Sequence, residues 1–124
     1  MVPLSDPAVA SMCHVMVETM STPAVIYDEG CIVYVNPALQ RLLKAPRIED
    51  VVGRPVLDFV HADARDAAIE RMRLVRENGA HLTHVKNRLL LCDGSELPVS
   101  LCAFPIMFGD VRLVGVLIED WSGR

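Results

Sequence analysis

The sequence predicts a single α+β domain, in which helices cover one face of a five-stranded antiparallel sheet and a further amphipathic helix precedes that sheet. The first reason is size, because 124 residues, 52% of them apolar, are enough to build one hydrophobic core. The second is that five apolar runs are bounded by turns or helices, and Gly or Asn-Pro marks several of these boundaries, as in antiparallel sheets. The third is a stretch of helical periodicity at residues 63–78.

Charge and composition exclude several classes of function. The formal charge is −4 and acidic and basic residues are interspersed, so no cationic stripe is available for nucleic acid. The longest apolar runs, such as residues 89–92, fall far short of the roughly 20 residues that span a bilayer, and the N-terminus lacks a basic signal-peptide start. We therefore expect a cytoplasmic protein that binds neither nucleic acid nor membranes.

The sequence contains four widely spaced cysteines, which are Cys13, Cys31, Cys92 and Cys102. This spacing suits neither a zinc site nor a disulfide scaffold, so we expect free thiols. His81 and His84 are the closest pair of histidines, but residues three apart in a strand face opposite ways. No metal site is expected.

The first element is a predicted helix at residues 5–20, with Pro7 in its first turn. Its apolar stripe is formed by Val9, Met12, Met16 and Met20. Two interpretations stay open, a seam between the two copies of a homodimer or a helix packed on its own sheet. We favour the seam, because the stripe and a sheet that is apolar on both faces leave a larger patch than monomers usually expose.

Two strands and a short helix follow. Residues 24–27 and 31–35 are rich in Val, Ile and Tyr, and the intervening Asp-Glu-Gly predicts a hairpin. Asn36-Pro37 ends the second strand, and residues 38–43 form a short helix. Prolines and a glycine between residues 44 and 60 predict short helical turns and loops.

The longer helix is predicted at residues 63–78. Its inward face is formed by Ala64, Ala68, Ile69, Met72 and Val75. Acidic and basic residues occupy much of the remaining surface, and Asn78-Gly79 ends the helix.

Three further strands, at residues 81–91, 96–104 and 111–120, are joined by Asp-Gly and Gly-Asp turns that suit hairpins. The last strand is apolar at every position from 113 to 118. A sheet with one wet face would alternate with polar residues there, so both faces of this strand are expected to be buried.

Several local sequences, in this order, resemble those of PAS domains. Residues 33–38 (VYVNPA) are similar to the second strand and the following helix start, and residues 52–65 to the family's stretch before the longer helix. Asp93-Gly94 with residues 97–100 is similar to its turn and next strand. Residues 119–122 are similar to the closing Asp-Ile-Thr motif, although Trp121 replaces the isoleucine. The resemblance covers almost the whole chain, and it divides the chain into a cap helix at 1–22, a PAS domain at 23–122 and a stub at 123–124 toward an effector.

The resemblance implies a sensor or interaction module of a signal-transduction protein, such as a two-component histidine kinase, a diguanylate cyclase or a transcription regulator. Such modules are often homodimers. A change in ligand state or partner contact is expected to shift the sheet, and the signal to leave through Asp120, Trp121 and Ser122 toward an effector outside this chain.

The resemblance also allows cofactor types to be checked. Flavin-sensing LOV members carry a reactive cysteine in a Gly-Arg-Asn-Cys-Arg-Phe stretch, and here Val56 stands in its place, which argues against a covalent flavin adduct and leaves non-covalent flavin open. Haem-binding members carry the iron ligand on the longer helix, and residues 62–78 contain no histidine. His61 just before this helix is expected to be a loop or capping residue. The cofactor, if any, stays unknown.

A cavity between the longer helix and the sheet is the candidate site for a small apolar or amphipathic ligand. Its candidate lining residues are Phe59, Ile69, Met72, Leu89, Leu101 and Leu117. His84 could point inward and bond a polar ligand, or lie exposed. The alternative is that these side chains simply fill the core at native density.

Two other functions stay open. One is a purely structural dimerisation module that binds no small molecule. The other is a small α+β hydratase or isomerase with a cone-shaped pocket, which would need a carboxylate buried among apolar side chains. The sequence shows no such carboxylate and no nucleophile beside a base, so we expect no catalytic residues in this domain.

Overall fold

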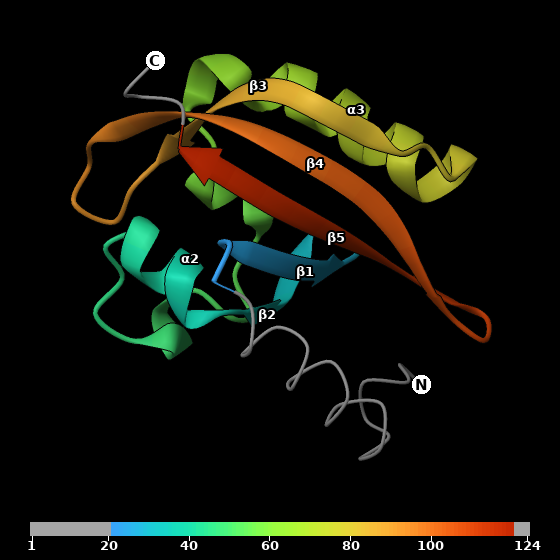
Figure 1. The fold of residues 1–124 in the computed structure, drawn as a ribbon, viewed down its shortest axis with the longest axis horizontal. Helices are drawn as coiled ribbons and strands as arrows, with labels where there is room; N and C mark the ends of the chain where they lie inside the picture. Colours follow the sequence, from blue (N-terminus) through green and yellow to red (C-terminus); the bar gives the residue numbers. More distant parts are fainter. Residues whose placement is uncertain (1–20, 121–124) are drawn as a thin grey trace.

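The computed structural model describes residues 21–120, which form a five-stranded antiparallel sheet with strand order β2-β1-β5-β4-β3 (Figure 1). This confirms the predicted fold class, while the predicted N-terminal helix lies outside the described residues. The strands are β1 (Ala24–Asp28), β2 (Cys31–Val35), β3 (Leu82–Leu90), β4 (Glu96–Phe108) and β5 (Val111–Asp120).

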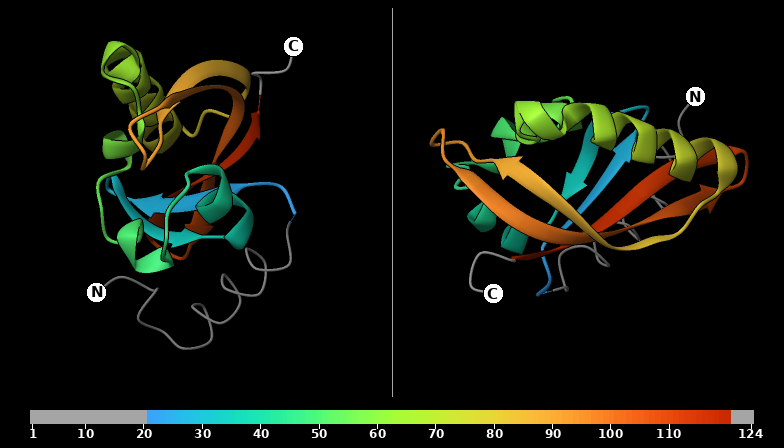
Figure 2. Two further views of the ribbon diagram at one scale, coloured as in Figure 1. Left: turned by 90° about the vertical axis from the view of Figure 1, so that its left-hand side faces the viewer. Right: turned by 90° about the horizontal axis from the view of Figure 1, so that it is seen from above.

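The helices of the described part connect β2 to β3 and pack on one face of the sheet (Figure 2). Two are α-helices, joined by short 3-10 turns as the prolines predicted. They are α2 (Pro37–Leu42), η2 (Ile48–Asp50), η3 (Val56–Phe59), η4 (Ala62–Ala64) and α3 (Arg65–Asn78). Together with the sheet they enclose the main core, in which Val51, Val75 and Val99 are at most 1% exposed.

Asn36 fixes where β2 ends and α2 begins. It caps α2, because its Oδ1 accepts the backbone N–H of Leu39 at 3.0 Å. The same oxygen accepts the N–H of Ala24 at 3.0 Å, and the Asn36 amide donates to the carbonyl of Thr22 at 2.7 Å. One fully buried polar side chain therefore joins the start of β1 to the start of α2.

Strand β5 lies in the centre of the sheet and is buried on both faces, as predicted. Val116 and Ile118 belong to the main core under the helices. Leu113, only 1% exposed, packs on the outer face with Ile26 and Ile106. A strand with partners on both edges and apolar contacts on both faces needs no polar alternation, which explains its sequence.

Two details of the prediction are wrong. Strand β4 was expected to end at residue 104, but it continues through Pro105 to Phe108, paired with β5 alone. Proline is tolerated there because β3 pairs no further along β4 than Ala103, which leaves this part of β4 on a sheet edge. The inward face of α3 was expected to include Ile69, whose exposure is 50%. Ala68, Met72 and Val75 form that face, and Ile69 lies one helical step outside it.

Candidate functional site: an apolar cavity between α3 and the sheet

A cavity of about 80 Å³ lies between α3 and the inner face of the sheet. The structure brings four of the predicted residues together in its wall, which are Phe59, Met72, Leu89 and Leu101. Val56 from η3 also lines it, as do Val116 and Ile118 from β5. Because β1, β3, β4 and β5 and the helices all contribute apolar side chains, a molecule placed here would touch most elements of the domain at once.

Three predicted lining residues do not lie in the cavity. Ile69 faces out of α3, as described above. Leu117 lies in β5 between Val116 and Ile118, which line the cavity, so strand alternation directs Leu117 to the outer face. His84 is exposed and has a positive φ of 55° at the irregularity between Leu82 and Val85, which removes it from the regular strand pattern.

Three residues with polar side chains also line the cavity, and the sequence pattern did not single them out. They are Tyr27, Arg71 and Asn87. Burial raises the pKa of the Tyr27 hydroxyl to about 12, so this group stays neutral in the folded domain. Burial also lowers the pKa of Arg71, because its surroundings disfavour the charged form.

A signal for two of these residues, Asn87 and Arg71, was present in the spacing. Asn87 lies two residues before Leu89 in β3, so both share one face of the strand. Arg71 lies three residues after Ala68 and four before Val75, which places it on the buried face of α3. A search for apolar residues alone passes over polar residues that share an apolar face.

The size and lining of the cavity limit what it can hold. An apolar cavity of roughly 150 Å³ accommodates benzene, about twice the volume found here. The fused rings of flavin and the macrocycle of haem are far larger than benzene, so neither fits this cavity in its present dimensions. No group of three or more metal-ligating side chains occurs in residues 21–120. The geometry suits a small, mainly apolar molecule.

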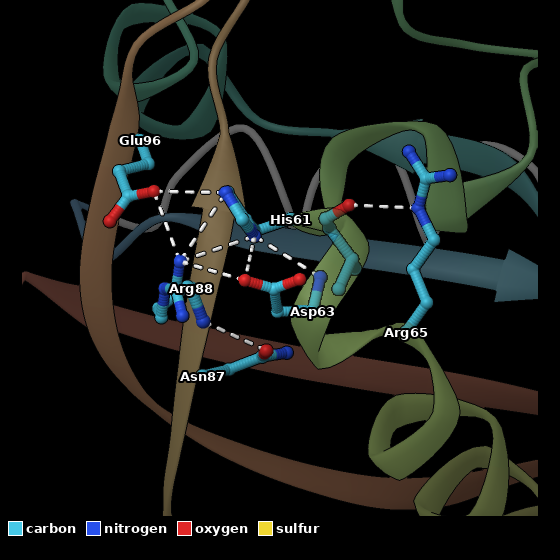
Figure 3. Close-up of polar contacts among 7 residues, drawn as sticks. His61, Asp63, Arg65, Asn87, Arg88 and Glu96 are labelled. Carbon is cyan, nitrogen blue, oxygen red and sulfur yellow. Dashed lines mark hydrogen bonds and ion pairs between the residues drawn. The ribbon is translucent and has the colours of Figure 1, made fainter.

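A polar cluster beside the cavity ties η4 to strands β3 and β4 (Figure 3). The Nε2 of His61 lies 3.0 Å from a carboxylate oxygen of Glu96, and a terminal guanidinium nitrogen of Arg88 donates to that same oxygen at 3.1 Å. Asp63 is more distant, 3.8 Å from both His61 and Arg88. The backbone N–H of His61 donates to the carbonyl of Arg88 at 2.9 Å.

This cluster holds the segment that directly precedes α3. His61 caps η4, since its Nδ1 accepts the N–H of Asp63 at 3.2 Å, which confirms the expected capping role. A terminal nitrogen of the Arg88 guanidinium lies within 3.3 Å of both imidazole nitrogens of His61, so the cation next to this ring is the Arg88 side chain. Its Nε is buried and has no partner among the described residues. The contacts join the segment that precedes α3 to strands β3 and β4.

The remaining predicted residues lie outside the part that the structure describes. These are Val9, Met12, Met16 and Met20 of the proposed seam and Trp121 and Ser122 of the proposed signal exit. Asp120 is the last residue of β5, where its backbone pairs with Val99. Within residues 21–120, no helix is long and apolar enough to cross a membrane.

Comparison with known proteins shows the same architecture elsewhere. The chain is 26% identical over 110 residues to Sporulation kinase A of Bacillus subtilis (strain 168), and the match covers 88% of this chain and 18% of the kinase. The chain therefore spans about a fifth of the length of that relative.

Solved structures agree with this match. The PAS domain of a protein from Colwellia psychrerythraea has a TM-score of 0.77 at 19% identity, covering 94% of this chain and 99% of that one. A LOV protein of Rhodobacter sphaeroides has a TM-score of 0.80 at 13% identity, covering 94% and 68%. The PAS domain of a two-component sensor histidine kinase has a TM-score of 0.71 at 17% identity, covering 91% and 96%. A sequence model of the PAS fold matches residues 11–120, and the chain belongs to the PAS domain family.

Proposed function

We propose that this PAS domain is the sensor module of a signal-transduction protein and that it detects a small molecule held in the cavity between α3 and the sheet. The class of protein is supported by the kinase relatives, which include Sporulation kinase A and a two-component sensor histidine kinase. Because the chain spans 18% of Sporulation kinase A, an effector with kinase activity lies outside this chain in the proposal. A cytoplasmic location belongs to the same proposal.

The observation that carries the proposal is the position of β5 in the cavity wall. Val116 and Ile118 line the cavity, and β5 ends two residues after Ile118, at Asp120. Well-packed interiors transmit displacements, so a molecule that fills or widens the cavity shifts β5 along with α3. The shift then leaves through Asp120, Trp121 and Ser122 toward the effector. Ligand binding thus changes the direction or tension of the chain at the C-terminal end of β5.

A second copy of the chain is the proposed partner of the outer face of the sheet. This face carries the buried pair Ile26 and Leu113, and Ile106 packs against them. Val33 and Val111 also pack against this pair and are only partly buried, so this face keeps accessible apolar surface. We propose that a homodimer forms through this face and the N-terminal stripe of Val9, Met12, Met16 and Met20.

A cavity-filling variant tests ligand binding. Ala68 is 6% exposed and lines the cavity from α3, so Ala68→Leu fills part of the space. The protein is purified from its native host under mild conditions, and native mass spectrometry measures any bound small molecule. We expect a bound mass in the wild type that is absent in Ala68→Leu. The control is Ala62→Leu, an exposed alanine ahead of the same helix, which should keep the bound mass.

Other outcomes decide between the functions. A wild-type protein that is empty after purification from its host would favour a purely structural dimerisation module. A bound mass retained by Ala68→Leu would place the ligand outside the cavity. Thermal unfolding of both variants shows whether overpacking has disturbed the fold, which is expected to cost about 1–3 kcal/mol.

A further inference from the structure

A second hollow, of about 300 Å³, adjoins the cavity along the edge of the sheet. It lies between the N-terminal half of α3 and strands β3 and β4. Its charged lining residues are Arg71, Lys86 and Arg88, and no carboxylate lines it. Arg88 is paired with Glu96 at 3.1 Å, which leaves Arg71 as the guanidinium of this hollow without a carboxylate partner among residues 21–120.

The hollow and the cavity share two residues in their walls, Arg71 and Asn87. A guanidinium and an amide therefore lie where the two mainly apolar spaces meet. This juxtaposition suits an amphipathic molecule, whose apolar part prefers the cavity and whose charged part prefers the guanidinium at the junction.

Arg71 differs from its neighbours in having no compensating charge. Its side chain is half-buried and makes no hydrogen bond or ion pair within residues 21–120. Arg73, two residues further along α3, is paired with Glu70 at 2.6 Å and with Glu77 at 3.1 Å. Arg88 in the hollow is paired with Glu96. A guanidinium remains charged at neutral pH, so an anion bound at Arg71 would compensate a charge that burial has left unbalanced.

We propose that the ligand of this domain is a small amphipathic carboxylate, with a short alkyl chain in the cavity and its carboxylate on the Arg71 guanidinium at the junction with the hollow. This inference rests on the proposed function and adds the chemical class of ligand. The planar fork of arginine matches the two oxygens of a carboxylate, and the Asn87 amide can donate a further hydrogen bond. The cavity volume of about 80 Å³ limits the apolar part to a few carbon atoms.

The test compares ligands that share a tail and differ in the head group. Isothermal titration calorimetry on the 124-residue chain measures binding of pentanoate, 1-pentanol, pentylammonium, butyl phosphate and acetate. We expect pentanoate to bind at least tenfold more tightly than 1-pentanol, because a hydrogen bond to a charged group contributes more than a neutral one. Pentylammonium, which brings a like charge to Arg71, and acetate, which lacks the tail, should bind more weakly still.

Variants of Arg71 test whether this residue binds the carboxylate head group of the ligand. Arg71→Gln should weaken pentanoate binding about tenfold or more and weaken 1-pentanol binding much less, whereas Arg71→Lys should retain part of the preference for the anion. The matched control is Arg73→Gln, which removes a paired arginine on the outer surface of the same helix and should not change either affinity. Circular dichroism verifies that each variant is folded.

Four results would overturn the inference. Equal affinities for pentanoate and 1-pentanol, or an unchanged pentanoate affinity in Arg71→Gln, would leave the cavity as an apolar site without anion recognition. Tighter binding of butyl phosphate than pentanoate would replace the carboxylate class by a phosphate ester. Absence of binding by all five compounds would reject this ligand class. Whether the cavity holds any ligand is decided independently, by the comparison of bound mass between the wild type and Ala68→Leu. The head-group comparison uses only wild-type protein, so it stands even if Arg71→Gln does not fold.

Discussion

Asp93, in the turn between β3 and β4, shows how a single exposed residue can influence stability. The Ser95 hydroxyl and backbone N–H donate to its Oδ1 at 2.5 and 3.0 Å, and Lys44 lies 3.0 Å from its Oδ2. These donors hold the pKa of the Asp93 carboxyl well below its usual value near 3.8. They also join the turn to the segment that follows α2.

The sign of the pH dependence follows from this shift. A carboxylate whose pKa is lower in the folded state contributes stability above its unfolded pKa, and that contribution is lost as the pH falls toward the folded value. Asp93→Asn should therefore lower the melting temperature most at neutral pH, and the difference from the wild type should shrink as the pH falls below about 4. Melting followed by circular dichroism between pH 7 and pH 2.5 measures this. A difference that stays constant over the range would contradict the assignment.

Individual residues were predictable where strand or helix periodicity governs them. Phe59, Met72, Leu89 and Leu101 reach the cavity because apolar residues at these spacings share one face. The partners of a charged side chain depend on elements distant in sequence. Arg71 has no ion-pair partner within residues 21–120 because of which carboxylates reach α3, and only the assembled fold determines that.

At the scale of elements, the junction of β1, β2 and α2 depends on one buried amide. Asn36 is 0% exposed and joins three backbone groups, on Thr22, Ala24 and Leu39. The sequence indicated a strand end at Asn36-Pro37. It did not indicate the long-range bonds, because Thr22 and Ala24 are more than ten residues away and approach only when the β1–β2 hairpin forms.

Asn36→Ala should destabilise the domain by about 2–4 kcal/mol, since it removes a helix cap and leaves the buried N–H of Ala24 without its side-chain acceptor. Urea unfolding followed by circular dichroism gives the free energy of unfolding. The control is Asn78→Ala, an exposed asparagine at the end of α3, which should change stability by about 0.5 kcal/mol or less. Equal effects of the two substitutions would show that the Asn36 network is unimportant.

The bounds and orientation of the elements show which of their features the sequence predicts and which it does not. The bounds of β2 and β5 are as predicted, since Gly-containing turns or a proline limit them. The phase of α3 is different, because three residues before Arg65 form the 3-10 turn η4 and the inward face is set by packing on the sheet. Helical periodicity predicts Ile69 on the inward face, but the face centred on Ala68 and Val75 leaves it half exposed.

At the scale of the whole molecule, the fold class was the most predictable property. Five apolar runs and their turns indicated an antiparallel sheet, and the apolar run at residues 113–118 indicated a strand buried on both faces, which the structure places in the centre of the sheet. How copies of the molecule associate depends on contacts between chains, which the pattern of a single sequence does not specify. The dimer seam therefore stays a prediction from amphipathicity.

Met16→Glu tests that seam. If Met16 lies in a dimer interface, a buried carboxylate there would weaken association strongly, and light scattering should report a monomer at concentrations where the wild type is a dimer. His14→Glu is the control, because His14 lies on another side of the predicted helix and should leave the dimer intact. A dimer that persists unchanged in Met16→Glu would contradict this placement.

The most direct test of the sensor account is a two-dimensional amide NMR titration of the full chain with pentanoate. The account predicts that saturation shifts the amide signals of Val116 and Ile118 in the cavity wall and those of Glu119 and Asp120 at the end of β5, and that Ala68→Leu abolishes all of these shifts. Saturation that shifts Val116 and Ile118 but leaves Glu119 and Asp120 unmoved would contradict it, since the cavity would then bind a molecule without reporting it at the C-terminal end of the sheet.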